Sequence, residues 1–192
     1  MDKPFFSILV VTYNSSWDKT RQTLYSILCQ QDIDFEIVVA DDGSKDNNFA
    51  SIKDYFSQYH FTKYTLVENK QNQGTVKNTL SGLKFCKGEY VKLISPGDFL
   101  YDEHTLFSAY KQIKTSTGAV FFGRCAYYSN EGDNLTVYKD KMNPFDVRPY
   151  LQQNYKQIRK NYFLNMDFIT GAAAIYKKEV FAQEKTHCKV DF

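Results

Sequence analysis

Strand-like apolar segments alternate with helical segments through the first half of the chain. "FSILVVTY", "FEIVVADDGS" and "YVKLI" each begin with or consist of a nearly continuous apolar run, as expected of strands that are covered on both faces. Between them lie helical segments with apolar residues three and four positions apart, such as Leu24, Ile27 and Leu28. Alternation of this kind builds a mostly parallel sheet with helices on both sides. The sequence therefore predicts an α/β fold, a Rossmann-like three-layer α/β/α sandwich.

Cap residues and apolar spacing give the expected helices of the first half. The first helix, within residues 15–30, is capped by Ser15 or Ser16. Asp46 caps the second, and a strand near "YTLVE" follows it. A third helix runs from Thr75 to about Cys86. The residues expected to face inward on the second and third helices are Phe49, Ile52, Phe56, Tyr59, Val76, Leu80 and Leu83.

The second half is less regular. A helix at 106–113, strands at "AVFFG" and "CAYYS", and a turn, short strand and helix start in "FITGAAAIYKKEVF" are expected. A long aromatic and polar segment runs from about Tyr138 to Asn165, and its Tyr-rich part, 138–162, either lines a binding groove or packs in the core and at its edges. The last stretch, "AQEKTHCKVDF", has no clear period. Residues 1–192 are expected to form one domain.

Composition excludes several classes of partner. A net charge of +2 gives no excess that would bind nucleic acid. Four widely spaced cysteines and three histidines predict neither a disulfide framework nor a zinc site, and favour a reducing cytoplasm. The N-terminus reads as a first strand and no apolar run is long enough to span a bilayer, while peripheral contact with the inner face of a membrane stays open. The oligomeric state is not predicted.

Polar residues follow three of the expected strands. Because ligands bind beyond the carboxyl ends of strands in open α/β sheets, these groups are expected to converge at one edge. Each group also has a plain interpretation, as a turn for Tyr13 and Asn14, and as a turn or helix cap for the acidic groups. The three groups are Thr12, Tyr13 and Asn14; Asp41, Asp42, Gly43 and Ser44; and Ser95, Pro96, Gly97 and Asp98.

The residue types fit a nucleoside diphosphate. A carboxylate can accept the imide N–H of uracil, and a tyrosine can pack against the face of the ring. An acid on another strand can hold a divalent cation that bridges two phosphates. A dinucleotide-binding dehydrogenase is disfavoured, because "TYNSS" follows the first strand in place of the required glycine-rich turn. A P-loop is also absent from the sequence.

The order of these segments resembles the family 2 glycosyltransferases, inverting enzymes of the GT-A fold that use nucleotide sugars. The similarity covers residues 4 to about 181 and rests on "FSILVVTYN", "LYSILCQQDIDFEIVVADDGSKDN", "NQGTVKNTLSGLKFCKGEYVKLISPGDFL" and "GAAAIYKKEVF". The resemblance implies that Thr12, Tyr13 and Asp41 or Asp42 surround the base. It also implies that residues 72–77, with Asn72, Gly74 and Lys77, line the nucleotide-sugar side. Residues 95–98 would occupy the D-x-D position, with Asp98 holding Mg²⁺ or Mn²⁺.

Two departures from the family pattern matter for activity. The D-x-D position holds a single acid, Asp98, where the family usually has two or three. The family also supplies a general base after the element that matches "GAAAIYKKEVF", and here Asp191 is the one late acid near the terminus, a weak candidate ahead of Asp167 and Asp102. We therefore expect a chain truncated before its base or altered at its end.

The resemblance implies transfer of a sugar, with inversion, from a UDP-sugar to a saccharide or lipid-linked acceptor in cell-surface polysaccharide synthesis. It also implies that 1–98 is the nucleotide-sugar-binding half of the domain and 99–192 the acceptor-side half. The alternative is a nucleotide-sugar-binding module or an inactive fragment that lacks the general base.

Overall fold

The structure is a computed structural model that describes residues 3–131 and 134–183. Its strands and helices follow one another in an alternating order over the first half, as predicted. In chain order the elements are β1 (Phe6–Thr12), α1 (Trp17–Leu28), β2 (Phe35–Asp41), α2 (Phe49–Gln58), β3 (Tyr64–Glu68), α3 (Thr75–Leu83), β4 (Tyr90–Ile94), α4 (Thr105–Lys114), β5 (Val120–Phe122), β6 (Cys125–Glu131), β7 (Asn134–Asn143), α5 (Arg148–Leu151), α6 (Tyr155–Asn165), η1 (Gly171–Ala173), β8 (Ala174–Lys177) and η2 (Lys178–Gln183).

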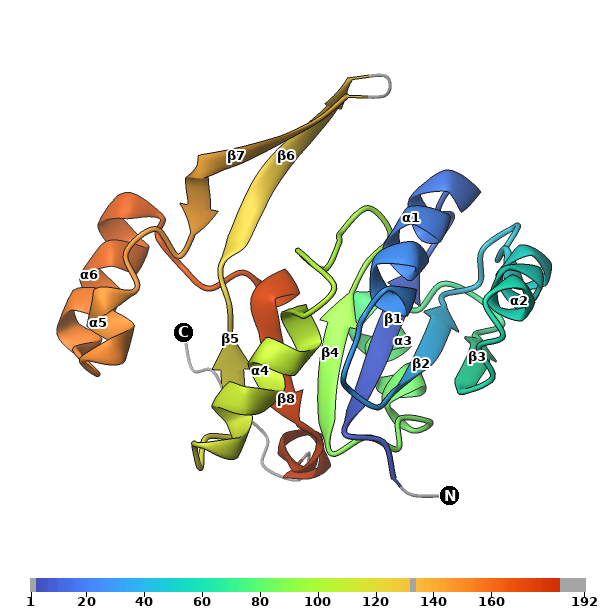
Figure 1. The fold of residues 1–192 in the computed structure, drawn as a ribbon, viewed down its shortest axis with the longest axis horizontal. Helices are drawn as coiled ribbons and strands as arrows, with labels where there is room; N and C mark the ends of the chain where they lie inside the picture. Colours follow the sequence, from blue (N-terminus) through green and yellow to red (C-terminus); the bar gives the residue numbers. More distant parts are fainter. Residues whose placement is uncertain (1–2, 132–133, 184–192) are drawn as a thin grey trace. The chain divides into compact units, whose positions relative to one another are not determined.

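The main sheet has the strand order β3-β2-β1-β4-β8-β5 (Figure 1). β1 pairs in parallel with both β2 and β4, and β3 pairs in parallel with β2. β8 runs antiparallel to β4 and separates it from β5. The sheet is therefore mostly parallel, as predicted, with one antiparallel strand that comes from late in the sequence.

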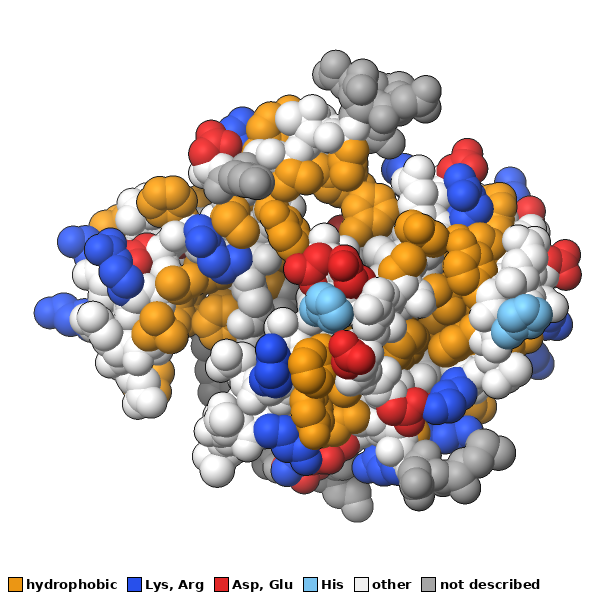
Figure 2. Space-filling view, viewed as in Figure 1, with side chains coloured by type: hydrophobic (Ala, Val, Ile, Leu, Met, Phe, Trp, Pro, Cys, Tyr) orange, Lys and Arg blue, Asp and Glu red, His pale blue; other side chains and the backbone are white. Residues whose placement is uncertain are grey.

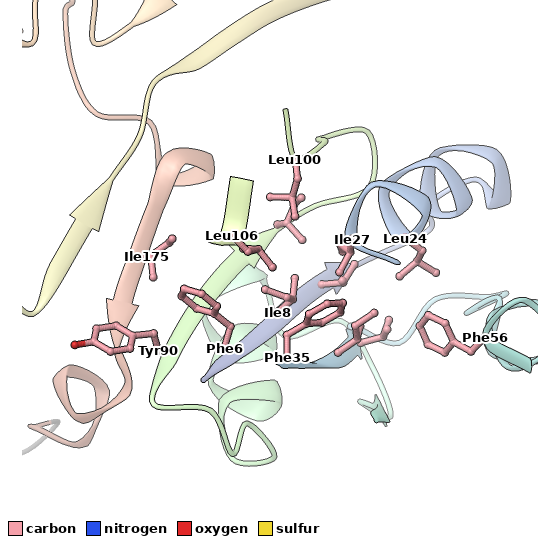
Figure 3. Close-up of a cluster of buried hydrophobic side chains, with 14 of the residues drawn as sticks. Phe6, Ile8, Leu24, Ile27, Phe35, Phe56, Tyr90, Leu100, Leu106 and Ile175 are labelled. Carbon is pink, nitrogen blue, oxygen red and sulfur yellow. The ribbon is translucent and has the colours of Figure 1, made fainter. Parts of the chain in front are cut away.

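Apolar side chains from alternate positions of the strands form a separate core on each face of the sheet. Phe6, Ile8 and Val10 of β1 point to one face, where α1, α2 and α4 pack (Figure 3). Leu9 points to the other face, where it packs with Leu83 of α3. Two cores on opposite faces confirm the three-layer α/β/α arrangement.

Two predicted inward positions of α2 and α3 and one predicted helix cap are wrong. Tyr59 lies beyond the last residue of α2 and is exposed, and Tyr55 is buried in its place. Asp46 does not cap α2, because its carboxylate accepts the N–H of Asn48, the residue before the helix. Val76 is 73% exposed in the first turn of α3, where Asn78 occupies the buried position and bonds to strand carbonyls instead.

The chain forms two compact units. Of the described residues, one unit contains 3–121 together with 175–183, and the other contains 122–131 and 134–174. The second unit holds the antiparallel pair β6 and β7 and the helices α5 and α6. β7 and α6 thus lie where no regular element was predicted, while the predicted division of one domain at residue 98 stays a prediction.

Candidate functional site

The polar ends of β1, β2 and β4 lie at one edge of the sheet. These strands are parallel neighbours, with Thr12 paired to Asp41 and Val10 paired to Ile94. Each strand runs into its polar residues within two positions of these pairs. The convergence predicted from the sequence is therefore present in the fold, because a parallel register brings the carboxyl ends together.

Asp41 ties the end of β2 to β1 and to its own loop. Its carboxylate accepts hydrogen bonds from the Thr12 hydroxyl at 2.9 Å, the Ser44 hydroxyl at 2.6 Å and the Ser44 N–H at 2.8 Å. The residue is only 1% exposed. A carboxylate with three neutral donors around it is stabilised in its charged form while buried.

The loop after β1 is bound to the loop after β2. The Asn14 N–H donates to the Ser44 hydroxyl at 2.7 Å, and the Lys45 N–H donates to Asn14 Oδ1 at 3.2 Å. Asn14 has a positive φ of 46°, which asparagine tolerates better than most residues. The side chain of Tyr13 is left exposed beside this junction. Asn14 is thus a turn residue, as in its plain interpretation, and this role does not prevent it from lying near a ligand.

Asp42 holds the segment that leads into α3. It accepts the N–H of Gln73 at 3.0 Å, the N–H of Gly74 at 2.8 Å and the side-chain amide of Asn69 at 3.3 Å, and it is 3% exposed. The side chain of Asn72 also accepts the Gly74 N–H, at 2.9 Å. An acid near the N-terminus of a helix is favoured by the helix dipole. Asp42 therefore holds the backbone just before α3 and fixes the position at which this helix begins.

Gly43 allows the loop after β2 to lie close to the segment before α3. Its φ is +72°, and a Cβ built on it would lie 2.6 Å from the backbone of Gln71. Both the conformation and the space exclude a larger residue. The glycine in "DDGS" is thus required by the geometry of the loop itself.

Sequence reasoning missed Asn78, which links α3 to two strand ends. Its side-chain amide donates to the carbonyl of Ala40 at 3.0 Å and that of Thr12 at 3.3 Å, and its Oδ1 accepts from Asn69 at 3.1 Å. The residue is buried. No local pattern pointed to this role, because Asn78 lies two positions from both Val76 and Leu80 and so falls on the side of the helix opposite to the apolar stripe of the sequence.

The segment after β4 forms a tight turn that is bound to α1. The Asp98 N–H donates to the Ser95 carbonyl at 2.9 Å, and Gly97 has a φ of +101°. Thr23 of α1 donates its hydroxyl to the Asp98 carbonyl at 2.9 Å and accepts the Gly97 N–H at 2.9 Å. Thr23 was not predicted as part of this edge, although it explains why the turn is held against α1.

The carboxylate of Asp98 is left available by this turn. It is partly exposed, and within the described residues it has no hydrogen-bond or ion-pair partner. The alternative role as a helix cap is wrong, because α4 begins at Thr105 and its N-cap is His104. Lys19 lies nearby, with its side chain 3.8 Å from the place where a Cβ on Gly97 would be. The loop therefore presents one anionic ligand with a lysine beside it.

The loop after β4 offers a divalent cation one protein ligand. Residues 3–131 and 134–183 contain no group of three or more acidic, histidine or cysteine side chains able to hold a metal. One carboxylate such as Asp98 can still serve as a single ligand for Mg²⁺ or Mn²⁺, provided that phosphate oxygens and water complete the octahedron. The residues present thus fit a metal that arrives with a diphosphate.

The two candidate general bases that the structure describes are both engaged in hydrogen bonds. Asp167 is buried and its two oxygens accept the N–H groups of Phe145 and Asp146. Asp102 accepts the His104 N–H and the Thr105 hydroxyl, both within its own loop. Asp191 lies outside the described residues. The assignment of a base stays a prediction.

Comparison with models of known protein families shows which family this chain belongs to. The family model described as "Glycosyl transferase family 2" matches residues 7–184. The chain belongs to glycosyl transferase family 2. Among curated members, the glycosyltransferase GlyG of Streptococcus pneumoniae is 24% identical over 184 residues, which cover 86% of this chain and 60% of GlyG.

Two solved structures are similar to this chain in fold. Staphylococcus aureus TarS residues 1–349 in complex with UDP-GlcNAc has 29% identity and a TM-score of 0.53, covering 60% of this chain and 32% of that one. The mannosyltransferase PcManGT of Pyrobaculum calidifontis, in complex with GDP-Man and Mn²⁺, has 19% identity and a TM-score of 0.66, covering 96% of this chain and 47% of that one. The GT-A fold predicted from the sequence is confirmed.

The family 2 relatives are longer than this chain, which spans 60% of GlyG and 52% of the uncharacterised glycosyltransferase of Methanocaldococcus jannaschii. Among the residues that the structure describes, no helix has the length and apolarity to cross a membrane.

Proposed function

We propose that this chain binds a UDP-sugar at the common edge of β1, β2 and β4 and serves inverting glycosyl transfer to a saccharide or lipid-linked acceptor. The observation that carries the proposal is the arrangement of three adjacent parallel strand ends, which place Tyr13, the Asp41–Ser44 loop and Asp98 at one edge. The similarity to TarS, which was solved with UDP-GlcNAc, supports a uridine donor. A role in cell-surface polysaccharide synthesis and a cytoplasmic location stay predictions.

Each part of the edge takes a role that its contacts permit. Tyr13 is exposed and offers a ring face to the base. Asp41 and Asp42 use three acceptor positions each within the protein, which leaves one position on each carboxylate for an imide N–H. Their main contribution is then to hold the loops that contact the donor.

The diphosphate is assigned to the space between α3 and the turn after β4. The side chains of Asn72 and Lys77 are exposed at the start of α3, and an ammonium group attracts phosphate oxygens. Asp98 would hold Mg²⁺ or Mn²⁺, which supplies positive charge to the leaving diphosphate when it is bound. Lys19 adds a second positive charge beside the same turn.

Transfer with inversion also needs a base that removes the proton from the acceptor hydroxyl. A nucleotide-sugar-binding module is the alternative, and it differs in one respect, because it binds the donor without turnover. Measuring binding and turnover on the same preparation separates the two.

The test is calorimetric titration of the chain with UDP, GDP and ADP, each with and without Mn²⁺. We expect UDP to bind most tightly, and more tightly with the metal than without it. Equal affinities for the three nucleotides would overturn the uridine assignment. Release of UDP from UDP-GlcNAc at saturating donor, with a set of saccharide acceptors, then reports transfer. Tight UDP binding with no release above the uncatalysed rate would favour the binding module.

A further inference from the structure

The helix α6 carries its large apolar residues on the outside. Successive residues of a helix are turned by about 100°, so Gln157, Ile158 and Asn161 share one side. This side is the covered one, with Asn161 buried and the Gln157 amide donating to Asn161 Oδ1 at 2.7 Å. The other side is exposed. The inward face of α6 is thus largely polar, the reverse of an ordinary surface helix.

The exposed side of α6 combines aromatic, aliphatic and basic residues, which we call the α6 patch. Its apolar members are between 50% and 76% exposed, and Figure 2 shows hydrophobic and basic side chains next to each other in the region of α5 and α6. α5 packs against α6 and adds Leu151, which is 80% exposed. The α6 patch consists of Tyr155, Lys156, Arg159, Lys160, Tyr162, Phe163 and Leu164.

The charge of this region has one sign. Between residues 147 and 166 the sequence has basic residues and no aspartate or glutamate. The two acids that flank the segment are engaged, Asp146 with Arg148 at 2.8 Å and Asp167 with two backbone N–H groups. Lys156, Arg159 and Lys160 are exposed, and within the described residues none of them forms an ion pair. The patch therefore complements a negatively charged surface.

The mixture of side chains favours a lipid surface over a protein partner. The centre of a protein interface is depleted in lysine, whereas Lys156 and Lys160 here share the exposed side of α6 with Phe163 and Leu164. At a bilayer surface the apolar side chains enter the boundary of the acyl region, the tyrosines lie at the headgroup level and the long basic side chains reach the phosphates. Anionic lipids attract each basic residue further.

We propose that the α6 patch docks this chain onto a membrane surface rich in anionic phospholipid. The proposal concerns a surface that the donor site does not use, and it holds whether or not UDP binds. It assigns the peripheral membrane contact left open by the composition to named residues on one helix face.

Sedimentation with lipid vesicles tests the proposal. The 192-residue chain is mixed with vesicles of phosphatidylcholine alone, or with one third phosphatidylglycerol. We expect binding to the anionic vesicles that weakens as salt rises. The triple variant Lys156→Gln, Arg159→Gln, Lys160→Gln should bind on the order of 100-fold more weakly at low salt. The double variant Phe163→Ser, Leu164→Ser should also lose binding, at least about tenfold.

Two control variants remove the same number of basic or large apolar side chains from surfaces outside the α6 patch. Lys53→Gln, Lys84→Gln, Lys111→Gln takes three exposed charges from α2, the end of α3 and α4, and Tyr25→Ser, Tyr101→Ser takes two exposed aromatic residues. Both controls should keep vesicle binding within about twofold of the parent chain. Equal losses in the patch and control variants, or no preference for anionic vesicles, would overturn the proposal. Self-association in light scattering that the double patch variant abolishes would assign the patch to a second copy of the chain instead.

Discussion

The carboxylate of Asp42, directly after β2, accepts the backbone N–H of Gly74, directly before α3, at 2.8 Å. This hydrogen bond joins two of the loops assigned to donor binding across 32 positions of sequence. It makes the geometry of residues 72–77 depend on a buried acid that the donor need not touch.

Asp42→Asn should destabilise the fold and weaken UDP binding together. The asparagine side chain would turn its NH₂ group toward one of the donors that Asp42 accepts, so one part-buried hydrogen bond to a charged acceptor is lost, at a cost of about 1 to 3 kcal/mol. Residues 72–77 lose part of their anchor, and UDP affinity falls for that reason. Urea denaturation and calorimetry measure the two effects. As a control, Asp46→Asn changes an exposed acid with one local hydrogen bond and should leave both quantities nearly unchanged; a similar loss in that variant would contradict the role of Asp42.

Asp98→Asn should abolish the Mn²⁺-dependent part of UDP affinity and leave the melting temperature close to that of the parent. The reason is that the carboxylate has no partner within the described structure, so folding gains little from its charge. Calorimetry with and without Mn²⁺, together with thermal unfolding, checks both halves. Asp102→Asn is the matched control, because its carboxylate serves its own loop, and it should lower stability while keeping the metal effect. If Asp98→Asn lowered stability and kept the Mn²⁺ effect, while Asp102→Asn lost the Mn²⁺ effect, Asp98 would not be the metal ligand.

Three glycine variants separate backbone strain from steric overlap. Gly74→Ala places a side chain at a φ of +86° in open space, which should cost about 1 to 3 kcal/mol of stability. Gly43→Ala adds an overlap with the backbone of Gln71 and should cost more than Gly74→Ala. Gly171→Ala has neither problem and should lie within about 0.5 kcal/mol of the parent. Urea denaturation gives the order, and a Gly43 variant as stable as the Gly171 variant would show that the loop relaxes freely.

Cys86 should make stability fall at alkaline pH. Burial raises the pKa of its thiol from 9.0 to about 12, and the nearby Glu36 adds to the effect. The folded protein therefore keeps the thiol proton where the unfolded chain has lost it, so the contribution is complete below pH 9 and is lost as pH rises towards about 12. The free energy of unfolding of the parent should decline more steeply over this range than that of Cys86→Ala. The pKa values of Tyr55 and Tyr90 are also raised by burial and act equally in both proteins, so identical slopes would contradict the assignment to Cys86.

The sequence was sufficient for the part of the fold that periodicity determines. Continuous apolar runs identified β1, β2 and β4, and their parallel pairing follows from the helices between them. The position of β8 between β4 and β5 could not be read in this way, because apolar spacing does not specify a strand's partner. α6 was missed because its apolar residues face outward and its covered side is polar, whereas the prediction looked for an apolar stripe facing the core. At the candidate site the residue types at the strand ends were visible, but the hydrogen bonds of Asn78 and Thr23 cross long stretches of sequence and leave no local pattern.

The strand order also affects how this chain can evolve. The segment Phe122–Ala174 starts in β5 and returns at the beginning of β8, the neighbouring strand, and the Gly123 N–H donates to the Ala173 carbonyl at 3.1 Å. An insertion whose two ends are held together can be lengthened or exchanged at a small entropic cost, roughly 0.6 kcal/mol for each doubling of its length. Descendants of such a chain can therefore acquire a new middle segment by recombination at two adjacent points, while the strands that carry the residues proposed to bind the donor keep their inherited order.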